Sequence, residues 1–474
     1  MEADRYNEYK GRIKSVFSDC DDFMERDISS NGAKCTVMYL RGITSRDYLS
    51  EKIIRPLAEY HSELQSFSGD YRSLLRTASV FTPPSAEVAC ERIIRGDVLV
   101  LVCVKNGFFP VLAGAQTEIS RDVSEPMSDV TVRGPKAGFT EDAEKNMVML
   151  RQYIRTPDLK FRRFTLGSLS NTKVMLAYVK GRAPDALVSS VAERLATLPS
   201  TAIVDSSNVS MLLTGKSYSF IPTVGSTEKV DKCASKLMSG RIAVIADGSP
   251  FVLTIPYLFV ESIQSSDDYF HTPVYATFIR ALRFVAFVAA VFAPAVLIAF
   301  FGDVSRAPDH PIGEVILSGR EDLPMDLFFE ICAVLLLFEL LREVGVRMPR
   351  TVGDAVGIVG SIILGDAAVN AGFVSSVAVI TVALSAVCAF MAPAFMYVTV
   401  ISRLAILMLA RLFGIYGVCL GAFALGALMF GQSSFGVPFM YPFAPFSKKG
   451  MQDCIFTDPK KTLGRNEIKG ETKW

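Results

Sequence analysis

The sequence predicts a two-part chain: an α/β half of two related subdomains, followed by a bundle of transmembrane α-helices. Two observations indicate this fold class. Residues 1–275 mix charged and hydrophobic residues as a folded soluble domain does. Half of the 474 residues are hydrophobic (50%), and they concentrate after residue 275, where 284–302, 367–402 and 412–447 carry no charge. Uncharged apolar runs of about 20 residues are long enough to cross a bilayer.

The first subdomain is predicted from strands that alternate with helices. Residues 35–43 have the composition of a buried strand, and a capped helical pattern follows them. Further along, the helical pattern of 85–96 ends at a glycine and 98–104 is a strand. An Asn-Gly pair then turns the chain, so that 108–113 returns beside that strand.

The same order of elements recurs in a second subdomain. A helix at 227–240 ends at a glycine, 241–246 is a strand, and an Asp-Gly turn leads to a return strand at 251–256. The repeat predicts two related subdomains. The expected division is 1–160 and 161–275 for the subdomains, 276–446 for the transmembrane domain and 447–474 for a basic tail. Because the polar N-terminus has no signal-peptide pattern, we expect the α/β half to be cytoplasmic.

The apolar half is expected to contain about four spans and one re-entrant segment. The predicted spans are 284–302, 325–345, 374–400 and 404–430. The tail and the stretch 347–350 are basic, whereas the connection 303–326 is acidic, so the positive-inside rule places both termini inside. The glycine-rich stretch 353–372 must then dip into the membrane and return, and backbone of this kind survives only when protein or water surrounds it.

This re-entrant stretch supplies the predicted pore. Asp366 and Asn370 are four residues apart and share one face of a helix, and a carboxylate in the bilayer costs about 2.5–3.5 kcal/mol unless it faces water or a partner. We therefore expect Asp366 to line a wet passage; the alternatives are a structural pair with an arginine such as Arg411 or a position near the membrane interface. The pore or gating candidates are Asp354, Gly360, Gly365, Asp366, Asn370 and Ser375.

A second group of charges lies on the predicted second span. Its members are Glu330, Glu339, Arg342, Glu343 and Arg347. Helical spacing makes Glu339 and Arg342, or Glu343 and Arg347, neighbours that form ion pairs. A stabilising interface between subunits is favoured over a gate. On the last span, Gly417 and Gly421 form a GxxxG pattern that predicts close helix packing.

The remaining motifs and the composition argue against an enzyme. The stretch "RGPKAGFTE" (133–141) lacks phosphate-loop spacing, and a turn followed by a helix that Thr140 caps explains it better. Three scattered histidines and nine cysteines without a CxxC spacing suggest no metal site, and nothing points to a cofactor. The net charge of +1 argues against nucleic acid as a partner.

Several ordered motifs resemble the GerA family of spore germination proteins. The cytoplasmic motif comprises Arg133, Gly134, Pro135, Gly138, Phe139, Thr140 and Glu141. The similarity continues through "GRIAVIADGSPFVLTIP" (240–256), "SSDDYF" (265–270) and "FELLREVGVRMPRTVGDAVGIVGSIILGDAAVNAGFVSS" (338–376) to "SFGVPFMYPFAP" (434–445). We expect this last segment to be an interfacial plug or a docking turn at the cytoplasmic face, and it is a candidate for coupling the two halves.

The resemblance implies a function and a location. It implies a multi-pass subunit of the spore inner membrane that forms a homo-oligomeric ring, conducts monovalent cations when a nutrient is sensed, and starts germination. The implied partners are a transporter-like B-type subunit, a C-type lipoprotein and the lipid bilayer. Two alternatives stay open: a SpoVAF-type channel that other ions activate and that amplifies germination, or a membrane scaffold that does not conduct.

Overall fold

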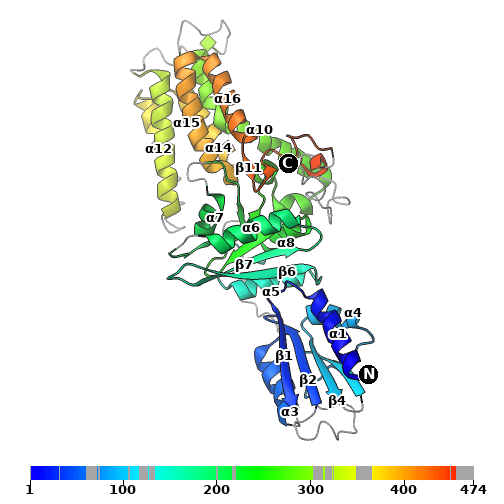
Figure 1. Ribbon diagram of the computed structural model, residues 1–474. Helices are drawn as coiled ribbons and strands as arrows, with labels where there is room; N and C mark the ends of the chain where they lie inside the picture. Colours follow the sequence, from blue (N-terminus) through cyan, green and yellow to red (C-terminus); the bar gives the residue numbers. More distant parts are fainter. Residues whose placement is uncertain are drawn as a thin grey trace.

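The computed structural model describes most of the chain. The described residues are 2–30, 33–59, 72, 75–104, 107–116, 126, 134–198, 201–215, 220–302, 313–314, 323, 325–347, 366–448 and 450–454. Figure 1 shows the first sheet near the N-terminus, the second sheet in the middle and the apolar helices at the other end.

The first subdomain is built on a five-stranded antiparallel sheet. Its strands are β1 (Phe23–Ser30), β2 (Ala33–Leu40), β3 (Val80–Phe81), β4 (Val98–Val104) and β5 (Gly107–Ala113), in the spatial order β1-β2-β4-β5-β3. The strand predicted at 98–104 is β4, and it is buried along its whole length. Such complete burial requires helices on both faces of the sheet.

Alternate residues of β4 face two separate cores. Leu99 and Leu101 pack with helices α1 (Glu2–Val16) and α4 (Ala86–Ile94). Val98, Val100 and Val102 pack on the opposite face. The helical run that covers that face consists of α2 (Arg46–Tyr48), a π-helical turn (Leu49–Ile54) and α3 (Arg55–Glu59).

The second subdomain repeats this topology. Its strands are β6 (Leu159–Leu166), β7 (Thr172–Val179), β8 (Gly225–Thr227), β9 (Ile242–Ala246) and β10 (Val252–Ile255), in the order β6-β7-β9-β10-β8. Helices α5 (Ala143–Tyr153) and α8 (Val230–Met238) cover one face, and α6 (Asp185–Thr197) and α7 (Ser206–Thr214) cover the other. Both sheets are antiparallel and have the same strand order, as related subdomains should.

Helix α5 belongs to the second core, although the sequence division places it with the first subdomain. Its residues Met147 and Leu150 pack with Phe161 of β6 and with α8. The division at residues 160 and 161 also falls inside β6. The second unit of the structure therefore includes the cytoplasmic motif and α5.

A buried ion pair joins the two subdomains. Arg151 of α5 lies 2.8 Å from the carboxylate of Asp22, and both side chains are at most 1% exposed. Close by, the Lys160 ammonium donates to the Val16 carbonyl oxygen at 2.7 Å, and the Asp21 amide donates to the Phe161 carbonyl oxygen at 2.9 Å. Direct bonds thus link the first and second cores.

The apolar half consists of helices that pack side by side (Figure 1). They are α10 (Pro273–Phe301), α12 (Leu327–Arg347), α14 (Ser376–Phe390), α15 (Met396–Phe413) and α16 (Ile415–Phe430). In the described part of the chain, two helices are long and apolar enough to cross a membrane, Pro273–Phe301 and Pro393–Phe413, while α14 and α16 are apolar but shorter. The expectation of four spans therefore stays a prediction.

Two predicted span boundaries are wrong. The helix expected over 374–400 stops at Phe390, because a short turn of 3-10 helix begins at Pro393 and a proline interrupts helical hydrogen bonding. The helix expected over 404–430 is broken at Gly414, whose φ of 58° reverses the chain between α15 and α16. Three helices replace the two that were expected. Most of the predicted re-entrant stretch lies outside the described residues.

Candidate functional site

The α/β half meets the apolar helices at a buried cluster of charges. Arg280, on the first turns of α10, is 1% exposed and contacts Asp268 at 3.0 Å and Asp453 at 3.0 Å. Arg283 contacts the same Asp268 at 2.8 Å. Since Asp268 precedes α10 and Asp453 lies near the end of the described chain, this cluster ties the C-terminal segment to the start of the helical domain.

The segment 431–454, which we call the C-terminal strap, packs against the linker between the halves. This linker is the stretch 256–272, between β10 and α10. The hydroxyl of Ser434 donates to the Thr223 carbonyl oxygen at 2.6 Å and accepts from the Tyr257 amide at 3.1 Å. The Phe259 amide donates to the carbonyl oxygen of Phe439, a fully buried residue, at 2.9 Å. The strap therefore contacts both the second subdomain and the linker that leads into α10.

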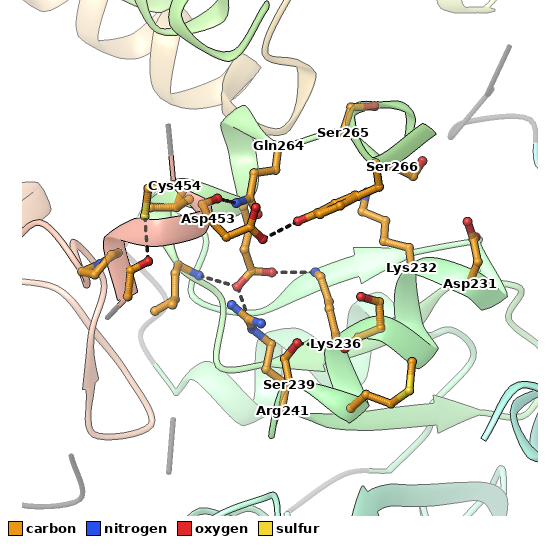
Figure 2. A pocket seen from close by; sticks show the side chains of 18 of the residues that line it. Asp231, Lys232, Lys236, Ser239, Arg241, Gln264, Ser265, Ser266, Asp453 and Cys454 are labelled. Carbon is orange, nitrogen blue, oxygen red and sulfur yellow. Dashed lines mark hydrogen bonds and ion pairs between the residues drawn. The ribbon is translucent and has the colours of Figure 1, made fainter. Parts of the chain in front are cut away.

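A cavity of about 330 Å³ opens beside the strap. Its walls come from the α8–β9 region, the linker and the strap. Figure 2 shows Lys236 and Arg241 on the subdomain side and Gln264 and Asp453 across from them. The cavity thus lies where any movement between the subdomain, linker and strap would change its shape.

Glu261 fixes the charged wall of this cavity. Its carboxylate lies 2.6 Å from Lys236 and 3.1 Å from Arg241. Burial alone would raise the pKa of Glu261, but the charges of Arg241 and Lys236 outweigh burial and lower it. For Lys236, burial disfavours the charged ammonium and lowers the pKa, and this effect outweighs the attraction of Glu261, which raises it. These three side chains form one buried ion-pair cluster in which two cations share a single carboxylate.

Inside the helical domain, Glu330 and Ser375 lie together. Glu330 is fully buried on α12, and its carboxylate accepts from the Ser375 amide at 2.9 Å and from the Ser375 hydroxyl at 2.7 Å. Ser375 is also the N-cap of α14 and accepts from the Ala378 amide at 3.2 Å. The carboxylate therefore connects α12 to the start of α14, where its negative charge suits the helix dipole.

A longer polar chain crosses four helices. Glu339 of α12 contacts Arg342 at 2.5 Å, as its helical spacing predicts, and also contacts Arg403 of α15 at 2.8 Å. Arg403 donates to the Ser385 hydroxyl of α14 at 3.0 Å, and Ser385 donates to the Ala290 carbonyl oxygen of α10 at 2.7 Å. We call Glu339, Arg403 and Ser385 the interhelical clasp.

Two further ion pairs lie nearer the surface. Glu343 and Arg347 are 2.7 Å apart, with side chains 59% and 77% exposed, so their pair adds little stability. Arg411, considered above as a partner for Asp366, instead contacts Asp326 at 2.7 Å.

Asp366 and Asn370 are exposed on one short helical turn before α14. Their exposure leaves both groups accessible to water or to a neighbouring molecule. Asp354, Gly360 and Gly365 lie outside the described residues, and Ser375 is buried against Glu330, so of the six pore candidates the structure places Asp366 and Asn370 together on one exposed turn.

The cytoplasmic motif forms a contact surface within the second subdomain. Phe139 is buried, and its amide donates to the Glu228 carbonyl oxygen at 2.7 Å. Gly138 bridges to Lys229, and the Gly248 amide donates to the Glu141 carbonyl oxygen at 2.7 Å. Arg133 lies outside the described residues.

The predicted cap of α5 is wrong. Asp142, not Thr140, is the N-cap, and its carboxylate accepts from the amides of Glu144 and Lys145. Thr140 instead fixes the loop, because its amide donates to Asn146 Oδ1 at 2.8 Å.

Gly134 needs to be glycine, since its φ is +117° and an added Cβ would lie 2.5 Å from the Phe270 ring.

Gly417 and Gly421 lie where α16 meets α15. A Cβ at Gly417 would be 1.9 Å from the Leu409 carbonyl oxygen, and one at Gly421 would be 2.7 Å from the Ile406 side chain. This is the close approach that a GxxxG spacing predicts.

The sequence interpretation missed Arg403, Asp268, Arg280 and Asp453. Arg403 carries its own signal, because a single arginine inside an apolar run usually faces a partner. Arg280 and Asp453 are 173 residues apart in the sequence. Spacing alone does not reveal a contact between such distant residues, nor the cluster that they form with Asp268.

Comparison with known proteins identifies the family. The model of the family described as Bacillus/Clostridium GerA spore germination protein matches residues 11–467. Spore germination protein KA of Bacillus subtilis is 34% identical over 89% of this chain and 78% of its own length. Spore germination protein GerLA of Bacillus cereus is 28% identical over 95% and 92%.

A solved structure also matches part of the chain. The N-terminal domain of the A subunit of the Bacillus megaterium spore germinant receptor GerK3 is 24% identical, covers 53% of this chain and 94% of its own, and has a TM-score of 0.39. The family match, which spans both halves of the chain, is the finding that assigns it. The chain belongs to the GerA family of spore germination proteins.

Proposed function

We propose that this protein is a membrane subunit of a spore germinant receptor in the spore inner membrane. Several copies form a ring whose centre conducts monovalent cations when a nutrient is sensed, and B-type and C-type subunits complete the receptor. The family supports the role in germination. The α/β half is cytoplasmic in this proposal, and the apolar helices span the bilayer.

One observation carries the channel part of the proposal. Asp366 and Asn370 are exposed together at the edge of an apolar helical domain, where a carboxylate facing lipid would be costly. In a symmetric ring each copy contributes one carboxylate, and a ring of carboxylates favours cations over anions. Among the described residues of the apolar half, the buried Glu330 and the half-buried Glu339 have partners within the chain, whereas Asp366 is exposed.

The strap supplies a path from the α/β half to the pore in this proposal. It contacts the second subdomain through Ser434 and α10 through Asp453. A movement of the subdomain would therefore pull on the start of α10 and on the segment that follows α16.

Recording from the purified full chain in planar bilayers tests the channel. We expect potassium currents, with Asp366→Asn lowering the unitary conductance by about two- to tenfold, because a charged lining raises the local cation concentration. Asp326→Asn is the matched control, since Asp326 is already paired with Arg411. Unchanged conductance and selectivity in Asp366→Asn would exclude this residue from the pore, and no current from any preparation would favour the scaffold alternative.

A further inference from the structure

The interhelical clasp is a point at which four of the apolar helices are joined by polar bonds. Arg403 is 2% exposed on α15 and uses one terminal nitrogen for Glu339 of α12 and the other for Ser385 of α14. Ser385 passes the connection on to the Ala290 carbonyl oxygen of α10. One side chain therefore sets the positions of three other helices.

The geometry requires a guanidinium. Nη2 lies 2.8 Å from Glu339 and Nη1 lies 3.0 Å from Ser385. A planar guanidinium presents two such donors in fixed directions, whereas a lysine ammonium is a single point on a flexible stem. Lysine at this position would keep the charge and lose the simultaneous contact with two helices.

The clasp leaves buried polar atoms unsatisfied. Within the described part of the chain, Arg403 Nε and the adjacent Ser402 hydroxyl are buried and have no hydrogen-bond partner. Apolar side chains of similar volume are often as stabilising as a buried ion pair, or more so. The arrangement therefore fits a role in specifying one conformation better than a role in stability.

We infer that Arg403 is a positioning residue of the proposed channel, and that it holds α12, α14 and α10 against α15 in the closed state. The inference rests on the proposed function. Charge alone does not perform this task, because the two-armed contact is what joins the helices. Weakening either arm favours separation of the helices and raises the fraction of time that the channel is open.

Single-channel recording of the full chain in planar bilayers tests the clasp through open probability. Arg403→Lys keeps the charge, and Ser385→Ala removes one arm with almost no change in volume. We expect each to raise the open probability without stimulus by about three- to twentyfold, the range that one interhelical hydrogen bond supports, with unitary conductance unchanged. Arg411→Gln is the matched control, since it breaks an exposed ion pair on the same helix.

The outcomes separate the clasp from the channel itself. Potassium currents in the unmodified protein with wild-type open probability in both Arg403→Lys and Ser385→Ala would overturn the clasp and leave the channel intact. A wild-type Arg403→Lys beside a leaky Arg403→Gln would also overturn it, by showing that charge suffices. Absence of current in the unmodified protein would overturn the proposed function and the clasp together. If Arg403→Lys does not fold, Ser385→Ala decides.

Discussion

At the scale of single residues, charge in the apolar half is compensated across helices. Glu339 has a helical neighbour in Arg342 and a second partner in Arg403, which is 64 positions away in the chain. The first contact follows from the helical repeat and was predictable. The second depends on how α12 and α15 pack, which no local pattern encodes.

Asp205 gives a prediction about pH at this scale. It is the N-cap of α7, and its carboxylate accepts from the Ser207 amide. Burial alone would raise its pKa, but hydrogen bonds from Ser207, Ser249 and the backbone lower the pKa to about 2. Because the pKa in the folded state lies below the ordinary aspartate pKa of 3.8, the stabilisation is present above about pH 4 and is lost as pH falls to about 2.

Asp205→Ala should therefore lower the free energy of unfolding by about 1 kcal/mol at pH 7, and by less near pH 2. Thermal unfolding of the full chain at both pH values measures this difference. Asp185→Ala is the control, because α6 begins after Pro184 without a side-chain capping bond. An equal loss at both pH values would contradict a role for the Asp205 charge.

At the scale of elements, hydrophobic pattern predicted the strands well and the ends of the apolar helices poorly. The strands predicted on either side of the Asp-Gly turn at 247–248 are β9 and β10. They were predictable because turn residues in the sequence mark where a strand begins or ends. The break at Gly414 is invisible in a continuous apolar run, since a hairpin between two packed helices and a single long helix have the same composition. Packing between α15 and α16 decides which one forms.

A pair of glycine substitutions tests that packing. Gly417→Ala places a methyl group 1.9 Å from the Leu409 carbonyl oxygen, whereas Gly426 on the same helix has open space around it. We expect Gly417→Ala to destabilise the protein by about 1–3 kcal/mol, and Gly426→Ala to be neutral or to stabilise it by up to about 1 kcal/mol. Thermal unfolding in detergent compares them; equal melting temperatures would mean that the α15–α16 contact is not tight.

At the scale of the whole molecule, the repeat in the sequence predicted two related subdomains, and the two sheets have the same strand order. It did not indicate how they join. Helix α5 lies in the second core because Phe139, Met147 and Leu150 pack against α8 and β6. Its hydrophobic periodicity shows that one face is buried, but it does not show which of the two subdomains buries that face. The cavity beside the strap was equally beyond prediction, because its walls come from three distant segments.

The join between the sheets depends on a buried pair. Arg151→Met leaves the Asp22 carboxylate buried without its cation, which should destabilise the full chain by about 3–5 kcal/mol. The double variant Asp22→Asn with Arg151→Met removes both charges and should recover part of that loss. Unfolding curves of the single and double variants measure the coupling; additive losses would show that the pair does not join the subdomains.

The central claim is that Asp366 from each copy borders a shared aqueous passage. A single-particle structure of the full-length assembly in lipid nanodiscs tests it most directly. We expect a closed ring with a central water-filled hole and the Asp366 carboxylates turned toward it. A single copy, or a ring in which Asp366 faces lipid or a dry seam between helices, would rule out the proposed pore.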